Sequence, residues 1–260
     1  GGIVSMRSQG REMVIRKPQL VTFRPLTDND RGNGSGFDRA QWFGAGRYAK
    51  LVKEDVVTDT NSVDATYTYA LATPQATEVT LRYRVDSKGK MRLTVSYPGG
   101  VDAASLPAFG IEWMLPLQYS CLKFYGLGPD ETYKDRDNGA KLGIFTSTAH
   151  ASAADYLVPQ ETGQRTGVRW AEVTDQFGHG LRVQQAGEQT FNMSLLPYST
   201  LQLEDAWHQD ELPQPRHTYM RLLADQMGVG GDDSWGAPVH DQFLLDADKP
   251  LTLDVTIDLI

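Results

Sequence analysis

Apolar and polar side chains alternate with a period of two in three stretches of the chain. In 79–85 and 91–97, Val, Leu, Met and Tyr occupy the odd positions and Thr, Ser and Arg the even ones. The stretch 251–259 alternates in the same way over its whole length. Because successive side chains of a strand point to opposite faces of its sheet, this pattern predicts three half-buried β-strands.

The residues between the first two stretches predict a tight hairpin turn, because Gly89 in 86–90 can adopt the positive φ that such a turn needs. Helical signal is scarce: 205–212 predicts a short helix, and 218–225 fits a helix or a strand. No fixed-period repeat and no Pro-rich or Gly/Ser-rich linker divides the chain. We therefore predict one all-β domain over 1–260, a large antiparallel β-sandwich.

The charge balance argues against two classes of partner. Lys and Arg total 25 and Asp and Glu total 33, which gives a formal net charge of −8. Nucleic-acid binding and docking on an anionic membrane both need a basic surface, so neither is expected. No apolar run approaches the ~18 residues of a membrane-spanning helix. The 40% of apolar residues is enough for a sizeable core.

The single cysteine and the N-terminus bear on cellular location. Cys121 is alone, which excludes an internal disulfide framework and a Cys-based zinc site. Residues 1–4 show no signal-peptide pattern, although a cleaved signal would leave the same start. We expect a cytoplasmic protein, with the periplasm left open.

The acidic segment 28–32 resembles a calcium loop only at first sight. An EF-hand loop that begins at Asp28 needs Gly at its sixth position and Glu at its twelfth, where this chain has Asn33 and Arg39. The match fails, and we interpret 28–36 as a polar loop.

The glycine-rich run 228–236 is a second candidate site. Adjacent carboxylates at Asp232 and Asp233 would repel a phosphate, and no Lys follows, so a nucleotide loop is not expected. The two carboxylates could instead accept N–H groups of the loop and hold Trp235 at its tip. There the indole could stack on the apolar face of a sugar ring. The alternative is that Trp235 caps the core, because Trp is usually well buried.

Two carboxylates and the histidines complete the candidates. Glu131 and Glu161 could form a glycosidase pair, but each is expected to be structural and to pair with Arg136 or Arg165. A His acting with a Glu could move a proton on a sugar hydroxyl. No two His have the helical metal-ligand spacing i, i+4. The histidines are His150, His179, His208, His217 and His240.

Several blocks of the chain together resemble the β-galactosidases of glycoside hydrolase family 2. The most specific is Met-Gly-Val-Gly-Gly-Asp-Asp-Ser-Trp at 227–235. Two others are Arg-Pro-Leu-Thr-Asp-Asn-Asp-Arg-Gly at 24–32 and Gly-Leu-Gly-Pro-Asp-Glu-Thr-Tyr-Lys-Asp-Arg at 126–136. The remaining blocks are 156–163, 165–167, 191–192, 198–199 and 206–208. The chain is similar to the C-terminal domain, which some of these enzymes carry as a separate small chain.

This resemblance implies a galactose-mutarotase-like supersandwich and a role in sugar binding. In the family, the acid/base and nucleophile Glu residues lie on a TIM-barrel domain, so no catalytic residue is expected here. The residue matching the family's substrate-binding tryptophan is Trp235, which would stack on the sugar, chiefly in the aglycone subsite. Gly32 matches the start of a mobile loop near the active site, and Asp232 and Asp233 would support the tryptophan loop. The segment after Gly32 is shorter and richer in Gly and Ser than in the family, so loop gating is not carried over.

The function that follows is hydrolysis of terminal β-D-galactosides such as lactose by a larger enzyme. We expect this chain to be its C-terminal domain or small subunit, inactive alone, with a catalytic barrel domain or large subunit as partner. No cofactor is expected on this chain, magnesium is expected on the catalytic domain, and the complete enzyme is expected to be a homo-oligomer. The start at Gly1 suggests a fragment or a truncated small chain. The alternatives are a free-standing aldose-epimerase-like enzyme and a carbohydrate-binding module.

Overall fold

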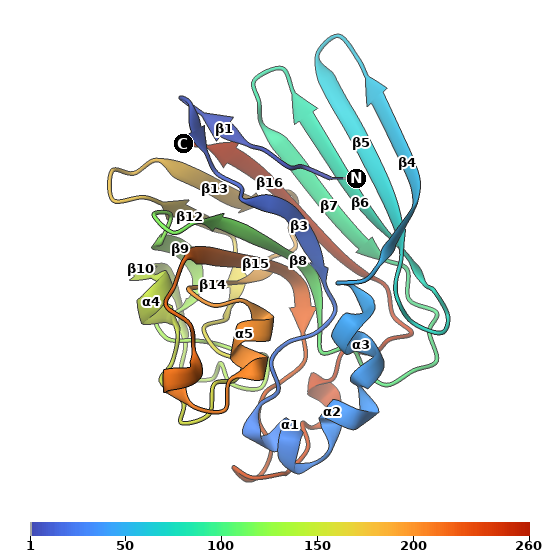
Figure 1. Ribbon diagram of the computed structural model, residues 1–260, viewed down its shortest axis with the longest axis vertical. Helices are drawn as coiled ribbons and strands as arrows, with labels where there is room; N and C mark the ends of the chain where they lie inside the picture. Colours follow the sequence, from blue (N-terminus) through green and yellow to red (C-terminus); the bar gives the residue numbers. More distant parts are fainter. Residues whose placement is uncertain (1) are drawn as a thin grey trace.

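The chain forms two large antiparallel sheets and a short two-stranded ribbon (Figure 1). The computed structural model describes residues 2–260, so Gly1, the first residue of the stretch without a signal-peptide pattern, lies outside it. In spatial order, the nine-stranded sheet contains β10 (Lys141–Thr148), β9 (Cys121–Gly128), β12 (Trp170–Thr174), β13 (Gly180–Gln185), β16 (Leu251–Leu259), β7 (Met91–Tyr97), β6 (Glu78–Asp86), β5 (Ser62–Ala70) and β4 (Lys50–Thr58).

The five-stranded sheet contains β11 (Arg165–Val168), β14 (Phe191–Leu196), β15 (His217–Gln226), β8 (Ala108–Pro116) and β3 (Arg16–Val21). The ribbon pairs β1 (Arg7–Ser8) with β2 (Arg11–Glu12). The all-β antiparallel prediction is confirmed. The ambiguous segment 218–225 is a strand, since it lies within β15.

The three alternating stretches are neighbouring strands in the middle of the larger sheet. β6 and β7 pair as the predicted hairpin, and β16 pairs with the other edge of β7. In this register Leu81 lies opposite Val95, and Val95 lies opposite Leu253. All three side chains are buried, so the apolar parity of each stretch builds one continuous surface.

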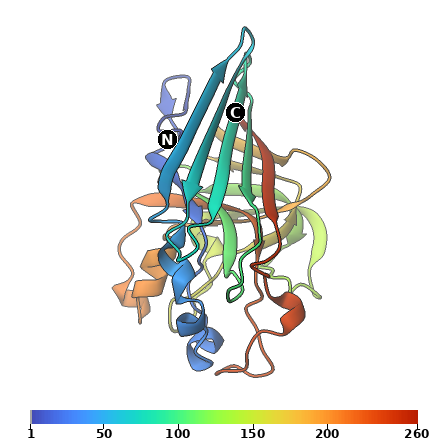
Figure 2. The same ribbon diagram turned by 90° about the vertical axis from the view of Figure 1, so that its right-hand side faces the viewer.

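The core lies between the two sheets. β7 and β16 of the larger sheet contact β8 and β15 of the smaller one. β8 brings Phe109 and Trp113 into this core, and neither is exposed to solvent. Burying a large apolar side chain of this kind contributes about 1.5–3 kcal/mol. β4, in contrast, is exposed along its whole length, and Figure 2 shows β4 to β7 extending beyond the five-stranded sheet.

The polar segment at 28–36 is helical, so the prediction of a loop is wrong. α1 (Asp28–Gly32) begins after Thr27, whose hydroxyl accepts the N–H of Asp30 while the Asp30 carboxylate accepts the N–H of Thr27. This reciprocal capping satisfies N–H groups that a helix start leaves free. α2 (Ser35–Asp38) and α3 (Ala40–Ala45) follow directly.

The predicted helix at 205–212 is also wrong in position. α5 (Thr200–Asp205) begins earlier, because Ser199 and Gln202 form a capping box at its start. Only the single 3₁₀ turn η1 (Gln209–Glu211) lies within the predicted segment. The remaining short elements are α4 (Ala149–Ser152) and the 3₁₀ turn η2 (Asp241–Phe243). Over residues 2–260, no helix has the length and apolar character needed to cross a membrane.

Candidate functional site

The long loop that joins β15 to β16 carries Trp235 on the molecular surface. It runs at the end of the molecule where α1 and α2 lie, away from both chain termini (Figure 1). Trp235 is 77% exposed to solvent. The interpretation that Trp235 caps the core is therefore wrong, and its indole is free to contact a ligand or another part of an enzyme.

Asp233 organises the tip of this loop. Its Oδ1 accepts the backbone N–H groups of Trp235 at 3.0 Å, Gly236 at 3.0 Å and Ala237 at 2.9 Å. These donors, with that of Trp235 first, lower the pKa of Asp233. Asp232 takes no part in this arrangement. Its Oδ1 instead lies 2.9 Å from Nε2 of His240 on the exposed surface. The expectation that both carboxylates hold loop N–H groups is met by Asp233, whereas Asp232 pairs with a side chain.

Helix α1 packs directly against the Trp235 loop. A Cβ atom at Gly32 would lie 2.2 Å from the carbonyl oxygen of Trp235 and 2.8 Å from Cα of Gly236. Glycine is therefore required for this close approach of two backbones. Asn29 adds a bond, because its Nδ2 donates to the carbonyl oxygen of Asp233 at 2.9 Å. The motif blocks at 24–32 and 227–235 meet here, although they lie far apart in the sequence.

The buried side chain of Arg24 connects α1 to the beginning of the loop. Its side chain is 1% exposed, its Nη1 donates to Asp30 at 2.6 Å, and its Nη2 donates to the carbonyl oxygen of Gly228 at 2.9 Å. Burial alone would lower the pKa of Arg24, but the carboxylates of Asp30 and Glu161 raise it overall. Arg24 therefore stays charged and ties the cap of α1 to the loop.

The two predicted carboxylates, Glu131 and Glu161, have structural partners. Glu131 lies 3.2 Å from Arg136, as predicted, and accepts the N–H of Gly163 at 2.7 Å. The prediction that Glu161 pairs with Arg165 is wrong: Glu161 pairs with Arg221 at 2.9 Å, and both side chains are buried. Arg221 on β15 faces this carboxylate. No sequence pattern predicts the pair, because the two residues lie 60 positions apart in the chain. Both carboxylates are therefore engaged within the chain.

The histidines do not form the buried His–Glu pair that an aldose epimerase would need. His208 lies 3.0 Å from Glu211, and this contact raises the pKa of His208, but both side chains are exposed and belong to one turn of η1. His179 lies 3.5 Å from Asp175, whose Oδ1 also accepts N–H groups in the turn between β12 and β13. These contacts stabilise turns, and they do not favour the epimerase alternative.

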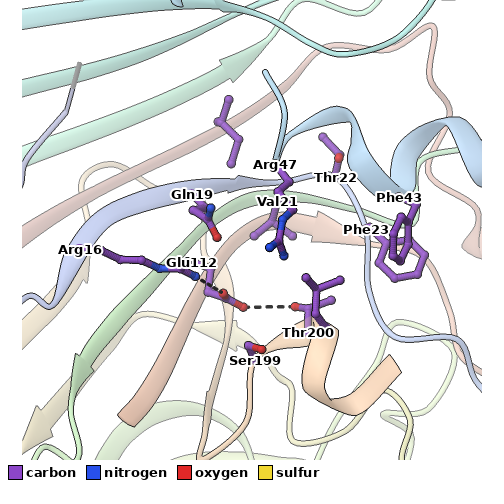
Figure 3. Close-up of a pocket in the computed structure, with 12 residues that line it drawn as sticks. Arg16, Gln19, Val21, Thr22, Phe23, Phe43, Arg47, Glu112, Ser199 and Thr200 are labelled. Carbon is purple, nitrogen blue, oxygen red and sulfur yellow. Dashed lines mark hydrogen bonds and ion pairs between the residues drawn. The ribbon is translucent and has the colours of Figure 1, made fainter. Parts of the chain in front are cut away.

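A separate cavity lies on the outer side of β3 and β8, next to the start of α5 (Figure 3). Its volume of about 70 Å³ gives room for roughly two water molecules. Glu112 lines it, accepting from the Thr200 hydroxyl at 3.2 Å and facing Arg16 at 3.8 Å. Burial raises the pKa of Glu112. This cavity contains none of the predicted site residues.

Within 2–260, no group of three or more His, Cys, Asp or Glu side chains is arranged to hold a metal ion.

Comparison with known proteins identifies the family. Residues 1–257 match the family described as beta galactosidase small chain. The chain belongs to this family. Beta-galactosidase BgaC of Bifidobacterium adolescentis is 57% identical over 263 residues, which cover all of this chain and 25% of that protein. The beta-galactosidase small subunit of Latilactobacillus sakei is 33% identical over 95% of this chain and 86% of its own length.

The chain thus spans about a quarter of BgaC, but most of the separate L. sakei subunit. Among solved structures, a galactose mutarotase related enzyme from Lactobacillus acidophilus covers 97% of this chain and 88% of its own, with 7% identity and a TM-score of 0.42. So distant a likeness supports no argument about function.

Sequence reasoning missed the residues that hold the Trp235 loop from outside it. Arg24 and Asn29 lie within the first motif block, and Asp135 lies within the block at 126–136. Asp135 accepts two N–H groups of the loop. Membership in these blocks was the available signal, but only the fold shows which residues meet.

Proposed function

We propose that this small chain completes the sugar-binding site of a β-galactosidase of glycoside hydrolase family 2. The catalytic Glu pair would lie on a TIM-barrel domain or large subunit that joins this chain in the complete enzyme. The observation that carries the proposal is the exposed indole of Trp235 on a loop held by Asp233 and by α1. Membership in the small-chain family supports it.

In this proposal the contribution of the small chain is binding. The ring of Trp235 would cover the apolar face of the sugar or its aglycone, which contributes about 0.5–1.5 kcal/mol beyond burial of the ring. Asp233 and Gly32 would keep the loop in one conformation, and Asp232 would support its outer side. A loop that is already ordered loses less conformational entropy when a ligand binds.

Bond cleavage would belong to the catalytic part. A retaining glycosidase needs two carboxyl groups about 5–5.5 Å apart, one as acid/base and one as nucleophile. Glu131 and Glu161 are held in ion pairs with Arg136 and Arg221, so they fit structural roles. Magnesium would likewise be held by the catalytic part. The substrate would be a terminal β-D-galactoside such as lactose, and the complete enzyme a homo-oligomer.

The proposal is tested by assaying the small chain alone and the complete enzyme on a chromogenic β-galactoside. We expect turnover by the complete enzyme and none by the small chain. Turnover by the isolated chain that disappears when one of its own carboxylates is replaced would overturn the proposal.

A calorimetric titration of the isolated chain with galactose separates this role from that of a carbohydrate-binding module. Half of a binding site should give little or no heat. Clear saturable binding by the chain alone, unaffected by Trp235→Ala, would favour the module instead.

A further inference from the structure

The orientation of Trp235 must be set by its backbone, because its ring packs against few other residues. With 77% of the residue exposed, few neighbours restrain the indole directly. Asp233 fixes the tip of the loop from within. The stem of the loop, Gly228 to Gly230, therefore decides where the whole tip is placed relative to the rest of the molecule.

The carboxylate of Asp135, from a distant part of the chain, binds the backbone of this stem. Its Oδ1 accepts the N–H of Val229 at 3.1 Å, and its Oδ2 accepts the N–H of Gly230 at 2.8 Å. A Cβ atom at Gly228 would lie 2.3 Å from Oδ2, so the glycine there leaves the room that the carboxylate occupies. Successive backbone N–H groups around one carboxylate form an anion-binding arrangement, and bonds to a charged acceptor are stronger than neutral ones.

The turn that carries Asp135 is itself well anchored. Tyr133 and Arg136 bond to each other through their backbones, which places Lys134 and Asp135 at the tip of a tight turn. Lys134 reaches Asp225 on β15 at 2.6 Å. Arg136 on the other side pairs with Glu131 at 3.2 Å. The carboxylate of Asp135 is thus presented to the loop from a fixed base.

We propose that Asp135 is a positioning residue for Trp235. It touches no reacting atom, and it acts by holding the loop stem so that the indole meets the substrate in one orientation. This inference rests on the proposed function, since it takes Trp235 to contact the sugar or its aglycone. Arg24 also holds the loop stem, through its bond to the carbonyl oxygen of Gly228.

The first measurement uses the small chain alone. Asp135→Asn keeps the size of the side chain but turns one acceptor oxygen into an NH₂ group that faces a backbone N–H. We expect amide hydrogen exchange across 228–237 to become about tenfold faster or more, while strands of the core keep their protection. The matched control is Asp130→Asn, an exposed carboxylate in the same segment. Unchanged exchange in Asp135→Asn would overturn the inference.

The second measurement is a double-mutant cycle in the complete enzyme. Asp135→Asn should raise KM for a β-galactoside by up to about fivefold, the full value of the indole contact, with little change in kcat. In the Trp235→Ala background the same substitution should add nothing, because its effect passes through the indole. A general loss of structure would lower kcat in both backgrounds alike.

The outcomes separate the two claims. If Trp235→Ala weakens the enzyme and Asp135→Asn loosens the loop without raising KM, the positioning role is refuted and the proposed function stands. If Trp235→Ala leaves the kinetics unchanged, the proposed function fails, and the positioning role fails with it. If Asp135→Asn does not fold, Asp135→Ser provides the same comparison with a smaller side chain and no donor NH₂ group.

Discussion

Replacing Gly32 by alanine tests the contact that joins α1 to the Trp235 loop. The new Cβ atom would lie 2.2 Å from the carbonyl oxygen of Trp235, with Cα of Gly236 at 2.8 Å. Comfortable contacts between such atoms begin at about 3.5 Å, so the two backbones must separate by about 1 Å. Because both clashing groups are backbone, no side-chain rotation can relieve them.

Two free-energy terms oppose each other in Gly32→Ala. Overpacking of this kind costs about 1–3 kcal/mol. Alanine in place of glycine at the end of α1 returns up to about 1 kcal/mol through helix propensity. The net loss of about 0–3 kcal/mol would lower Tm by no more than roughly 12 °C at this chain length. The displacement of the loop is therefore a more sensitive readout than the stability of the fold.

The assay combines hydrogen exchange across 228–237 with steady-state kinetics of the complete enzyme. Displacing the indole by about 1 Å can cost at most its stacking contact of about 1 kcal/mol, so we expect kcat/KM to fall by up to about fivefold. Gly187→Ala is the matched control, because a Cβ atom there has nothing within 4 Å. If Gly32→Ala matched this control in both exchange and kcat/KM, the reasoning about the contact would be refuted.

Two further predictions concern buried charges. Burial raises the pKa of Glu112, so the native state binds its proton more tightly than the unfolded chain. The stability that the protonated carboxyl contributes is full below the usual pKa of Glu and is lost as pH rises through the folded value. Urea unfolding at several pH values tests this. From about pH 4 to pH 7 the free energy of unfolding of Glu112→Gln should rise relative to that of the unsubstituted protein. A difference that stays constant with pH would contradict the prediction. Glu161→Leu leaves Arg221 buried without its carboxylate and should lower the free energy of unfolding by about 3–5 kcal/mol. The double variant Glu161→Leu with Arg221→Met should lose less than the sum of the two single losses. Additive losses would disprove this coupling.

The fold could be predicted from the sequence where burial is one-sided. β6, β7 and β16 alternate because one face of each meets the core and the other meets solvent. β8 gives no such signal, since most of its side chains are buried on both faces. The helical start at α1 was missed because a capping box uses the same Thr, Asp and Asn residues that favour loops.

The candidate site divides in a similar way. Trp235 and Gly32 stand out in the sequence because motif blocks carry them, and their roles at a sugar site stay predictions. Glu131 was paired correctly with a nearby arginine in the chain. The bond from Arg24 to Gly228 spans 204 residues, and the bond from Val229 to Asp135 spans 94. Such contacts depend on how the two sheets place their loops, which local patterns do not encode.

The role of Trp235 is tested most directly by comparing Trp235→Ala and Trp235→Phe in the complete enzyme, on a β-galactoside with an aromatic aglycone. A lost stacking contact worth about 1 kcal/mol should raise KM about fivefold for Trp235→Ala, with kcat largely retained and with partial recovery in Trp235→Phe. A KM that stays the same in both variants would contradict the account, because it would mean that this exposed indole contacts no substrate.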